Sequence, residues 1–431
     1  MIKKLLKTIC VVFFGEKKCM VLRVYLLRVW HRMPRYYFYS KKYSKYTNNV
    51  PNVIVLGRQK ADVFFGYYDL TPFSQDGNRL LSHIYFKKKS SELHLACWDI
   101  SSSQNLQMRT FAKTETWCWQ MGARLQWLPS GSGELVIFNT LVDGYFGSVV
   151  MDLCTEKVLK RYNRPVYSVS ESAQKALYLN FSRLHRLRPG YGYRNYPDET
   201  QGKLAPNDDG LFVLDLEAGE THLIYSLKEI SETQALSDYS DAEHYINHIL
   251  WNPSGDKYLF FHLWQKERIR YSRLMVGGDC FPLRCVCWPL GGNVSHYTWR
   301  SDWEILLTVS DAKKEVRYIL IDIRTGLQRV LGAGNLTTDG HPSFSPRNNN
   351  CIVSDTYPDR YRNQLVFMYN SKCDRQEKIA KFYSPCKFNG EYRCDLHPRF
   401  NCDGSSVCVD SAHAGRRQMI VMPVEGCGGN L

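Results

Sequence analysis

The sequence has no two cysteines at Cys-x-x-Cys spacing, although it contains 15 cysteines in 431 residues. An odd number, scattered along the chain, does not fit the even, closely spaced set of a small disulfide framework. Several cysteines, such as Cys97 and Cys408, stand in apolar stretches, where we expect them to be buried as small apolar side chains. This usage indicates a reducing compartment.

An apolar run long enough to span a bilayer is also missing. The two apolar stretches near the start are interrupted by the charged residues 16–18 and by Arg23 and Arg28. No small-residue cleavage site of a secretory signal peptide follows them. We therefore expect a cytoplasmic protein, peripheral to the inner membrane face if residues 1–49 bind it, rather than an exported one. The Gly-x-Ser-x-Gly nucleophile elbow is absent too, which argues against a propeller-linked peptidase.

Negative charge is scarce, because 42 acidic residues face 56 basic ones and the net charge is +14. Such an excess favours an acidic partner: a glycan, a nucleic acid or an anionic lipid surface. Nucleic acid has only the charge in its favour, since no recognisable module is present. Residues 1–49 are predicted to form a basic helical extension, which either lies on an anionic membrane or is a loosely ordered tail.

Seven repeats of one pattern fill the rest of the chain. Each has an apolar strand ending on an anchor residue, a turn rich in Pro, Asn, Asp, Ser or Gly, and a second strand. Spacings of roughly 40–50 residues with several strands per unit are typical of β-propellers. We therefore predict an all-β, seven-bladed β-propeller over residues 50–431. The anchors are Phe73, Trp127, Val169, Trp251, Trp299, Phe344 and Phe400.

The seventh repeat ends before it supplies four strands. The isolated apolar segment 53–56, which precedes the first repeat, is expected to complete the last blade and to close the ring. Two insertions interrupt the regular spacing, one in residues 181–209 and one in residues 226–243. Long loops on a rigid scaffold often carry function.

Four histidines stand three residues before four consecutive anchors, at the entrance of the innermost strand: His248, His296, His341 and His397. A single histidine there would usually cap its own blade, but four at one register should converge on the channel. Clustered imidazoles bind a metal or keep each other neutral. We predict a zinc or manganese site of His296, His341 and His397 with the carboxylates Asp355 and Asp410, and Asp395 is a further possible oxygen ligand.

The loops on that face are basic and aromatic. Guanidinium groups match carboxylates in bidentate geometry, and aromatic rings stack on sugars. A solvated rim is the alternative interpretation of such charges. The predicted substrate-binding residues are Arg183, Tyr193, Arg194, Arg360, Arg362, Arg416 and Arg417.

The strings HPSFSP (341–346) with SDTYPDRYRNQ (354–364), and RCDLHPRF (393–400) with DSAHAGRRQ (410–418), resemble two groups of propellers. One is the TolB-like group. The other comprises the propeller-fold polysaccharide lyases, which cleave oligogalacturonate or ulvan. The axial histidines are the more specific part of this resemblance, because those lyases have a histidine-rich metal site there.

The resemblance implies β-elimination on a uronate-containing glycan. This reaction needs neutralisation of the carboxylate, a base for the neighbouring C–H and an acid for the leaving oxygen. We expect Arg188 or the metal in the first role, His248 or His262 as the base, and Tyr245 or Tyr191 as the acid. A non-catalytic propeller that holds an acidic glycan during surface polysaccharide assembly at the membrane is the alternative.

Overall fold

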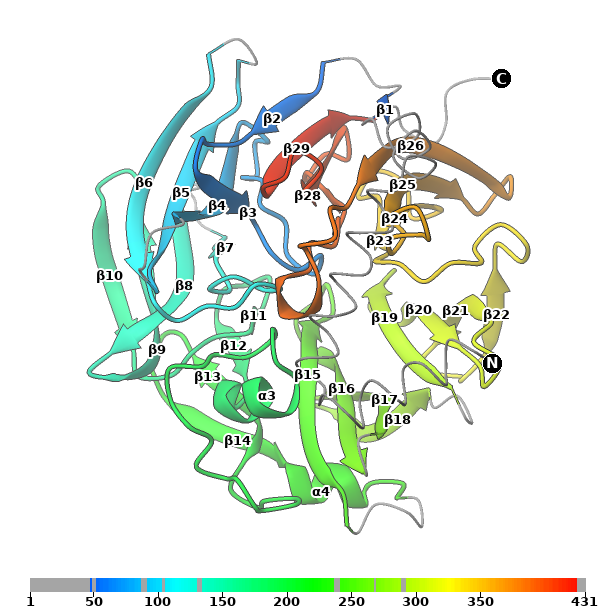
Figure 1. Ribbon diagram of the computed structural model, residues 1–431. Coiled ribbons are helices and arrows are strands. Elements are labelled where there is room, and N and C mark those ends of the chain that lie inside the picture. The colour runs from blue at the N-terminus through cyan, green and yellow to red at the C-terminus, as the bar shows by residue number, and fades with distance from the viewer. Residues whose placement is uncertain are drawn as a thin grey trace, which may run out of the picture.

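The computed structural model describes residues 47–48, 52–86, 91–102, 105–129, 134–235, 241–266, 269–287 and 292–424. The predicted basic extension therefore lies outside the described residues, apart from 47–48. In the described part, seven antiparallel sheets stand side by side in a ring (Figure 1). The seven-bladed propeller prediction is confirmed.

Each blade has its strands in chain order from the axis outward. The first three blades are β3 (Ala61–Phe64), β4 (Arg79–Phe86), β5 (Leu93–Asp99) and β6 (Gln107–Thr114); β7 (Gln126–Trp127), β8 (Leu135–Val142), β9 (Tyr145–Asp152) and β10 (Lys157–Tyr162); and β11 (Ser168–Val169), β12 (Lys175–Tyr178), β13 (Gly210–Asp215) and β14 (Thr221–Ser226).

Blades four and five are β15 (Glu243–Trp251), β16 (Lys257–Lys266), β17 (Ile269–Gly278) and β18 (Phe281–Cys287), then β19 (Asn293–Trp299), β20 (Glu304–Ser310), β21 (Val316–Asp322) and β22 (Gln328–Leu331). Blade six has β23 (Ser343–Phe344), β24 (Cys351–Asp355), β25 (Asn363–Asn370) and β26 (Arg375–Tyr383), and blade seven has β27 (Arg399–Phe400), β28 (Ser406–Ser411) and β29 (Gln418–Pro423).

Two early strands join the last two blades, β1 as a fifth strand of blade six and β2 as the fourth strand of blade seven. Strand β1 (Thr47–Asn48) pairs with the outer edge of β26, and β2 (Ile54–Leu56) pairs with β29, with Val55 opposite Ile420. The segment 53–56 thus supplies the fourth strand of blade seven. Because this strand comes from the other end of the sequence, it joins the two ends of the ring.

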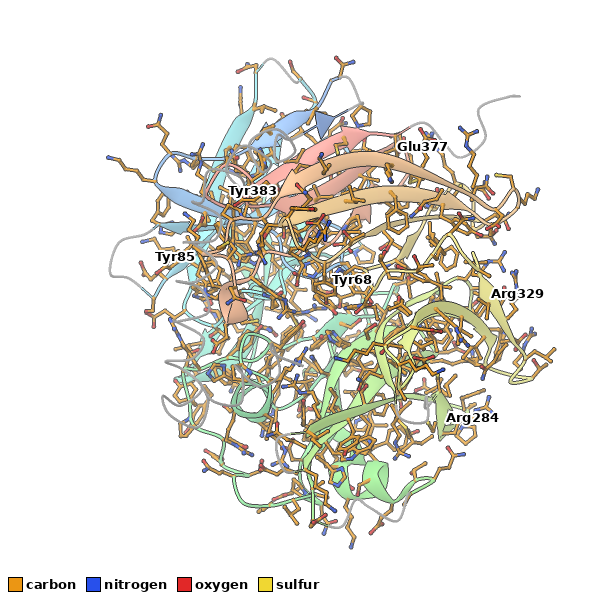
Figure 2. All side chains as sticks on the ribbon, turned by 45° about the vertical axis from the view of Figure 1, so that its right-hand side comes forward. Tyr68, Tyr85, Arg284, Arg329, Glu377 and Tyr383 are labelled. Atoms are coloured by element: carbon orange, nitrogen blue, oxygen red, sulfur yellow. The ribbon has the colours of Figure 1, made fainter. Side chains whose placement is uncertain are left out.

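Where the anchor is a tryptophan, it ties its blade to the preceding one. The indole Nε1 of Trp127 donates to the carbonyl oxygen of Pro72 at 2.9 Å, and that of Trp251 donates to Ser168 at 3.2 Å. Buried apolar side chains fill the spaces between blades, as Leu211, Leu259 and Leu307 do in one cluster shared by blades three, four and five. Figure 2 shows Tyr68 near the middle of the molecule, whereas Arg284, Arg329 and Glu377, on outer strands, lie toward the rim.

Blade one departs from the expected repeat. Strand β3 ends at Phe64, and the chain leaves the sheet before Phe73 pairs with Leu80. The backbone N–H groups of Phe65 and Gly66 are then satisfied by the carboxylate of Asp410, at 3.1 and 3.0 Å. Gly66 has φ +131°, and a Cβ there would lie 2.9 Å from a backbone carbon of Met121. Residues 65–69, which we call the axial loop, therefore run toward the centre.

The insertions form short helices on the face that carries the axial histidines. Helix α3 (Phe181–Leu187) begins at Asn180, whose side chain accepts the N–H of Arg183, and α4 (Leu227–Glu232) has a capping box at Ser226. A third short helix, the 3-10 helix η1 (Gly390–Tyr392), lies near α3 close to the axis (Figure 1). Among the described residues, no helix is long and apolar enough to cross a membrane.

Candidate functional site

The predicted axial histidines do converge. The ring centroids of His296 and His341 are 4.1 Å apart, and those of His341 and His397 are 4.4 Å apart. His248 stands beyond Tyr67, whose ring stacks on it at 4.5 Å and meets His397 edge-on at 4.8 Å. Three histidines therefore form one row, and the fourth lies across a tyrosine from it.

Backbone geometry turns these side chains inward. The backbone φ angles of His248 and His397 are +53° and +47°, values that residues other than glycine rarely adopt. His248 also lies in a register shift between Asn247 and Leu250, where β15 bulges away from β16. Bulges commonly re-aim side chains beside functional sites. The strain is held in place by the surrounding sheet.

His341, Asp395 and His397 offer ligand atoms that all lie within 4.8 Å of one another, and all three residues are buried. Nδ1 of His397 faces the carbonyl oxygen of Gly66 at 2.7 Å, and Nδ1 of His341 faces Oδ1 of Asp355 at 2.8 Å. Each Nδ1 must therefore carry the proton. The two Nε2 atoms are buried without a hydrogen-bond partner. Two such nitrogens beside a carboxylate fit a divalent cation.

In the row of three histidines, the pKa of the middle one, His341, is shifted in the opposite direction from the pKa values of His296 and His397. Burial lowers the pKa of His397 well below its ordinary value, and the neighbouring His341 lowers it further. Burial also acts to lower the pKa of His341, but the carboxylate of Asp355 raises it overall. Burial and His341 lower the pKa of His296. The rings of His296 and His397 are therefore held neutral, the form that binds metal, whereas the carboxylate beside His341 favours the protonated form of that ring until a cation replaces the proton on Nε2.

Two predicted ligands have other roles. Asp355 accepts the backbone N–H of His341 at 2.8 Å and that of His397 at 3.1 Å, besides Nδ1 of His341. Asp410 accepts from the axial loop and pairs with Arg399 at 3.0 Å. Their oxygens are occupied in holding the ligands and the axial loop. Of the three carboxylates predicted from the sequence as ligands, Asp395 is the one whose oxygen lies in the compact group with His341 and His397.

His296 is also outside the 4.8 Å group, although its ring, tilted by 56°, has its centroid 4.1 Å from that of His341. Its Nδ1 faces Oδ1 of Asp339 at 3.1 Å, and its Nε2 faces the hydroxyl of Tyr357 at 3.4 Å. Both of its nitrogens thus have partners in the described structure. His296 joins the cation group to the neighbouring pocket rather than completing the group itself.

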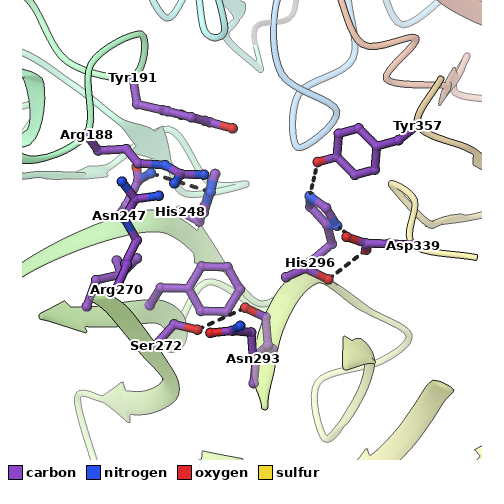
Figure 3. Close-up of a pocket in the computed structure, with 14 residues that line it drawn as sticks. Arg188, Tyr191, Asn247, His248, Arg270, Ser272, Asn293, His296, Asp339 and Tyr357 are labelled. Atoms are coloured by element: carbon purple, nitrogen blue, oxygen red, sulfur yellow. Dashed lines mark hydrogen bonds and ion pairs between the residues drawn. The ribbon is translucent and has the colours of Figure 1, made fainter. Parts of the chain in front are cut away.

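A cavity of about 270 Å³ opens between His248 and His296 (Figure 3). Two guanidinium groups, those of Arg188 and Arg270, lie on its wall, and no ion pair of either is found among the described residues. Among the described residues, Asp339 is the one carboxylate on the wall, and it is engaged by His296 and Ser295. The cavity is therefore positively charged. Its other lining residues are Tyr191, Asn247, His248, Phe261, Leu263, Ser272, Asn293, Val294, Ser295, His296 and Tyr357.

His248 and Tyr191 face each other on this wall. Burial, with the charges of His296 and Arg188, lowers the pKa of His248 well below its ordinary value, so the ring is neutral at neutral pH. Its Nδ1 is buried without a partner. The Tyr191 ring meets His248 edge-on at 5.4 Å, and its hydroxyl oxygen accepts a hydrogen bond from Nη2 of Arg393. The O–H of Tyr191 is not used in this hydrogen bond, so it can donate to another acceptor.

The other predicted acid and base lie away from the cavity. His262 has both ring nitrogens engaged, with Nδ1 of His244 at 2.9 Å and Nε of Arg273 at 3.0 Å. Tyr245 is buried with an unpartnered hydroxyl and is absent from the cavity wall, and burial raises its pKa. His262 is fully buried within its blade and is not among the residues that line the cavity.

Most of the predicted substrate-binding residues are structural. Arg183 is 1% exposed and donates to the carbonyl oxygens of His244, Lys203 and Leu204. Tyr193 bonds Asn139, and Arg362 bonds Ser384. Arg417 is buried over the Trp119 ring, at 4.7 Å. Arg194 and Arg360 are exposed and Arg416 is half-buried, and none lines the cavity.

Several residues of this centre were not predicted. Tyr67 and Tyr68 come from the axial loop, and the hydroxyl of Tyr68 donates to the carbonyl oxygen of Tyr297 at 2.7 Å. Asp339 and Tyr357 flank His296. The signal was present as Gly66-Tyr67-Tyr68-Asp69, a glycine and an aromatic pair where a regular repeat would have a strand. These residues precede the anchor Phe73 by more than three positions, so they lie outside the register at which the axial histidines stand.

Comparison with known proteins identifies the fold. No protein-family model matches the chain, and no curated protein matches it. Among solved structures, an oligogalacturonate lyase in complex with manganese is similar with a TM-score of 0.65 and 14% identity, over 89% of this chain and 97% of that one.

An oligogalacturonate lyase from Vibrio parahaemolyticus is similar with a TM-score of 0.61 and 12% identity, over 89% of this chain and 97% of that one. TolB from Acinetobacter baumannii matches with a TM-score of 0.38 and 14% identity, over 75% of this chain and 65% of that one. The chain thus has the seven-bladed fold of the lyases that the sequence resembles. At these identities the likeness concerns the fold.

Proposed function

We propose that the protein acts on an acidic, uronate-containing oligosaccharide by lyase-like β-elimination, with a divalent cation at the axis. One observation carries this proposal: the same cavity is lined by the neutral imidazole of His248 and by two guanidinium groups, Arg188 and Arg270, that have no ion-pair partner in the part of the chain that the structure describes. An anionic substrate would be bound by the two guanidinium groups, and a base would stand beside it.

The residues supply the parts of the reaction. Arg188 binds the uronate carboxylate, which makes the adjacent C5–H more acidic. His248 takes that proton, the C4–C5 double bond forms, and the bond from C4 to the leaving oxygen breaks. Tyr191 donates its phenol proton to the leaving oxygen, and His248 then gives up the C5 proton through solvent to the Tyr191 phenolate, so both groups return to their starting state. Each proton and electron pair is accounted for, and no oxidant or reductant is needed.

His341, Asp395 and His397 would hold the cation, zinc or manganese, and a cation there would add positive charge close to the substrate carboxylate. Asp355 and Gly66 orient the two imidazoles through their Nδ1 atoms. Partners of this kind typically fix the tautomer and the ring orientation of metal-binding histidines.

The test is an assay of uronate oligosaccharides for the ultraviolet absorbance of the unsaturated product, with the metal content of the protein measured in parallel. We expect activity from the wild type and a loss of at least about 100-fold in His248→Asn, as for a general base. His222→Asn, which changes an exposed imidazole on β14, is the matched control. Product formed equally by His248→Asn would contradict the assignment.

A non-catalytic propeller that holds an acidic glycan is the second candidate. Arg188, Arg270 and the Tyr191 ring suffice for binding without any cation. In that case the oligosaccharide would bind, with an affinity that falls with salt, and no unsaturated product would form from any uronate glycan tested.

We also propose that residues 1–49 attach the protein to the cytoplasmic face of an anionic membrane. The composition of this segment, basic and apolar in alternation, supports the proposal. Sedimentation with vesicles of phosphatidylglycerol and phosphatidylcholine, compared with pure phosphatidylcholine, tests it. Removal of residues 1–46 should abolish binding to the anionic vesicles, and unchanged binding would refute the assignment.

A further inference from the structure

One side chain connects the cation group to the wall of the cavity. Nε of Arg393 donates to Oδ2 of Asp395 at 2.6 Å, and Nη2 of the same guanidinium donates to the hydroxyl of Tyr191. Asp395 belongs to the candidate cation group, and Tyr191 lines the cavity. The two features come from blades seven and three, so Arg393 joins distant parts of the sequence.

The backbone of Arg393 is itself fixed by buried partners. Its carbonyl oxygen accepts from Nε2 of Gln120 at 3.0 Å and from Nη2 of Arg417 at 2.9 Å, and these two side chains are 1% and 2% exposed. Asp395 is 3% exposed on its side chain, against 27% for Arg393. The guanidinium is thus anchored on the interior and presents one edge to each of its two partners.

The loop of residues 188–193 rests on the segment that carries Arg393. Gly190 has φ +99°, and a Cβ there would lie 3.4 Å from Cα of Glu391. The backbone N–H of Gln120 donates to the carbonyl oxygen of Gly190 at 3.3 Å. Within the loop, the guanidinium of Arg188 lies over the Tyr191 ring at 5.1 Å. A shift of Tyr191 would therefore move Arg188, the proposed carboxylate-binding group.

We propose that Arg393 is a positioning residue that couples cation binding at Asp395 to the placement of Tyr191 and Arg188 on the cavity wall. The coupling rests on the proposed cation site. A guanidinium has five donors in a rigid fork and can hold a carboxylate and a phenol together, which an ammonium group does not do in the same geometry. A cation that fixes Asp395 also fixes Arg393, and through it the loop. Linkage is reciprocal, so an acidic ligand in the cavity tightens cation binding.

The experiment uses the full chain with Mn²⁺ alone as the probe. Titration calorimetry gives the Mn²⁺ affinity, and hydrogen–deuterium exchange follows peptides that cover residues 188–193, with and without saturating Mn²⁺. We expect Mn²⁺ to slow exchange of this loop in the wild type. In Arg393→Gln the loop should no longer respond, and Mn²⁺ should bind about 10- to 100-fold more weakly, as for loss of a residue that orients a ligand.

Four further variants separate coupling from general damage. Tyr191→Phe removes one oxygen and should weaken Mn²⁺ binding in the same direction, although Tyr191 touches no candidate ligand. In the Arg393→Gln background this change should have no further effect, since the link is already broken. Arg393→Lys should restore the affinity in part and the loop response not at all. Arg161→Gln, which removes an exposed guanidinium on β10, should behave as the wild type.

The outcomes are distinct. Equal loop protection by Mn²⁺ in the wild type and in Arg393→Gln overturns the coupling, as do additive effects of the two substitutions. Mn²⁺ binding that leaves the wild-type loop unchanged overturns the coupling alone, whereas no Mn²⁺ binding overturns the proposed cation site with it. If Arg393→Gln does not fold, as judged by near-ultraviolet circular dichroism, Tyr191→Phe decides: an unchanged Mn²⁺ affinity then refutes the coupling.

Discussion

The guanidinium of Arg124 and the carboxylate of Asp69 face each other in a buried bidentate pair. Nη1 lies 3.0 Å from Oδ1 and Nη2 lies 2.8 Å from Oδ2, and the two side chains are 1% and 8% exposed. Arg124 occupies in blade two the position that the axial histidines occupy in blades four to seven, and it too has a positive φ, of +52°. The pair fastens the C-terminal end of the axial loop, and with it Tyr67 and Tyr68.

Asp69→Asn should therefore destabilise the fold strongly. Removing one partner of a buried ion pair leaves the other charge uncompensated, at a cost of about 3–5 kcal/mol in the free energy of unfolding. The matched control is Asp279→Asn, because Asp279 pairs with Lys175 at 2.8 Å but is 54% exposed. Exposed pairs contribute at most about 1 kcal/mol. Urea denaturation measures the free energy of unfolding of both variants. A similarly small decrease in the two would contradict this role of the Arg124–Asp69 pair.

The role of Asp355 can be tested apart from that of the ligands. Asp355→Asn should keep one Mn²⁺ per chain but weaken its affinity by about 10- to 100-fold, because His341 loses the carboxylate that orients it. In the His341→Ala/His397→Ala double variant, bound Mn²⁺ should be lost. Atomic absorption and titration calorimetry distinguish the two results. Complete loss in Asp355→Asn would make this carboxylate a ligand after all.

Acid should destabilise the protein partly through His83. Burial lowers the pKa of this imidazole from 6.5 to about 3, and its Nε2 accepts the backbone N–H of Ala123 at 3.1 Å. Between these two pH values the unfolded chain binds a proton that the folded chain does not. The stability is therefore full above pH 6.5 and falls as the pH drops toward 3, by about 1.4 kcal/mol per pH unit for this group.

His83→Gln can still accept the N–H of Ala123 and should make the fall in stability between pH 6 and pH 4 shallower by roughly 1.4 kcal/mol per pH unit. His222→Gln, on the exposed face of β14, should leave the slope as it is. Urea denaturation at several pH values gives the slopes. Equal slopes in the wild type and in His83→Gln would show that His83 takes up its proton in the folded state.

Arg270 should determine the affinity for an acidic sugar without taking part in the chemistry. A hydrogen bond to a charged group contributes about 1.5–3 kcal/mol, so Arg270→Gln should raise KM about 10- to 100-fold and leave kcat nearly unchanged. Arg375→Gln, an exposed arginine on β26, is the control. An unchanged KM in Arg270→Gln would place the substrate outside this cavity.

The sequence by itself determined the ring of blades and the register at which four histidines enter it. Anchors such as Trp251 and Trp299 repeat because each blade needs the same turn and the same contact with its neighbour, and a local pattern of this kind is visible in one dimension. The closing segment 53–56 could be inferred in the same way, because an unpaired edge in a ring requires a strand.

Tertiary structure alone decided what each polar side chain does. Asp355 and Asp395 look alike in the sequence, yet one holds backbone N–H groups and the other faces two imidazole nitrogens. Arg183 and Arg188 stand five residues apart, and burial of α3 makes the first a scaffold and leaves the second on the cavity wall. These roles depend on which groups from distant blades satisfy each donor and acceptor, and that pairing is set by packing in three dimensions.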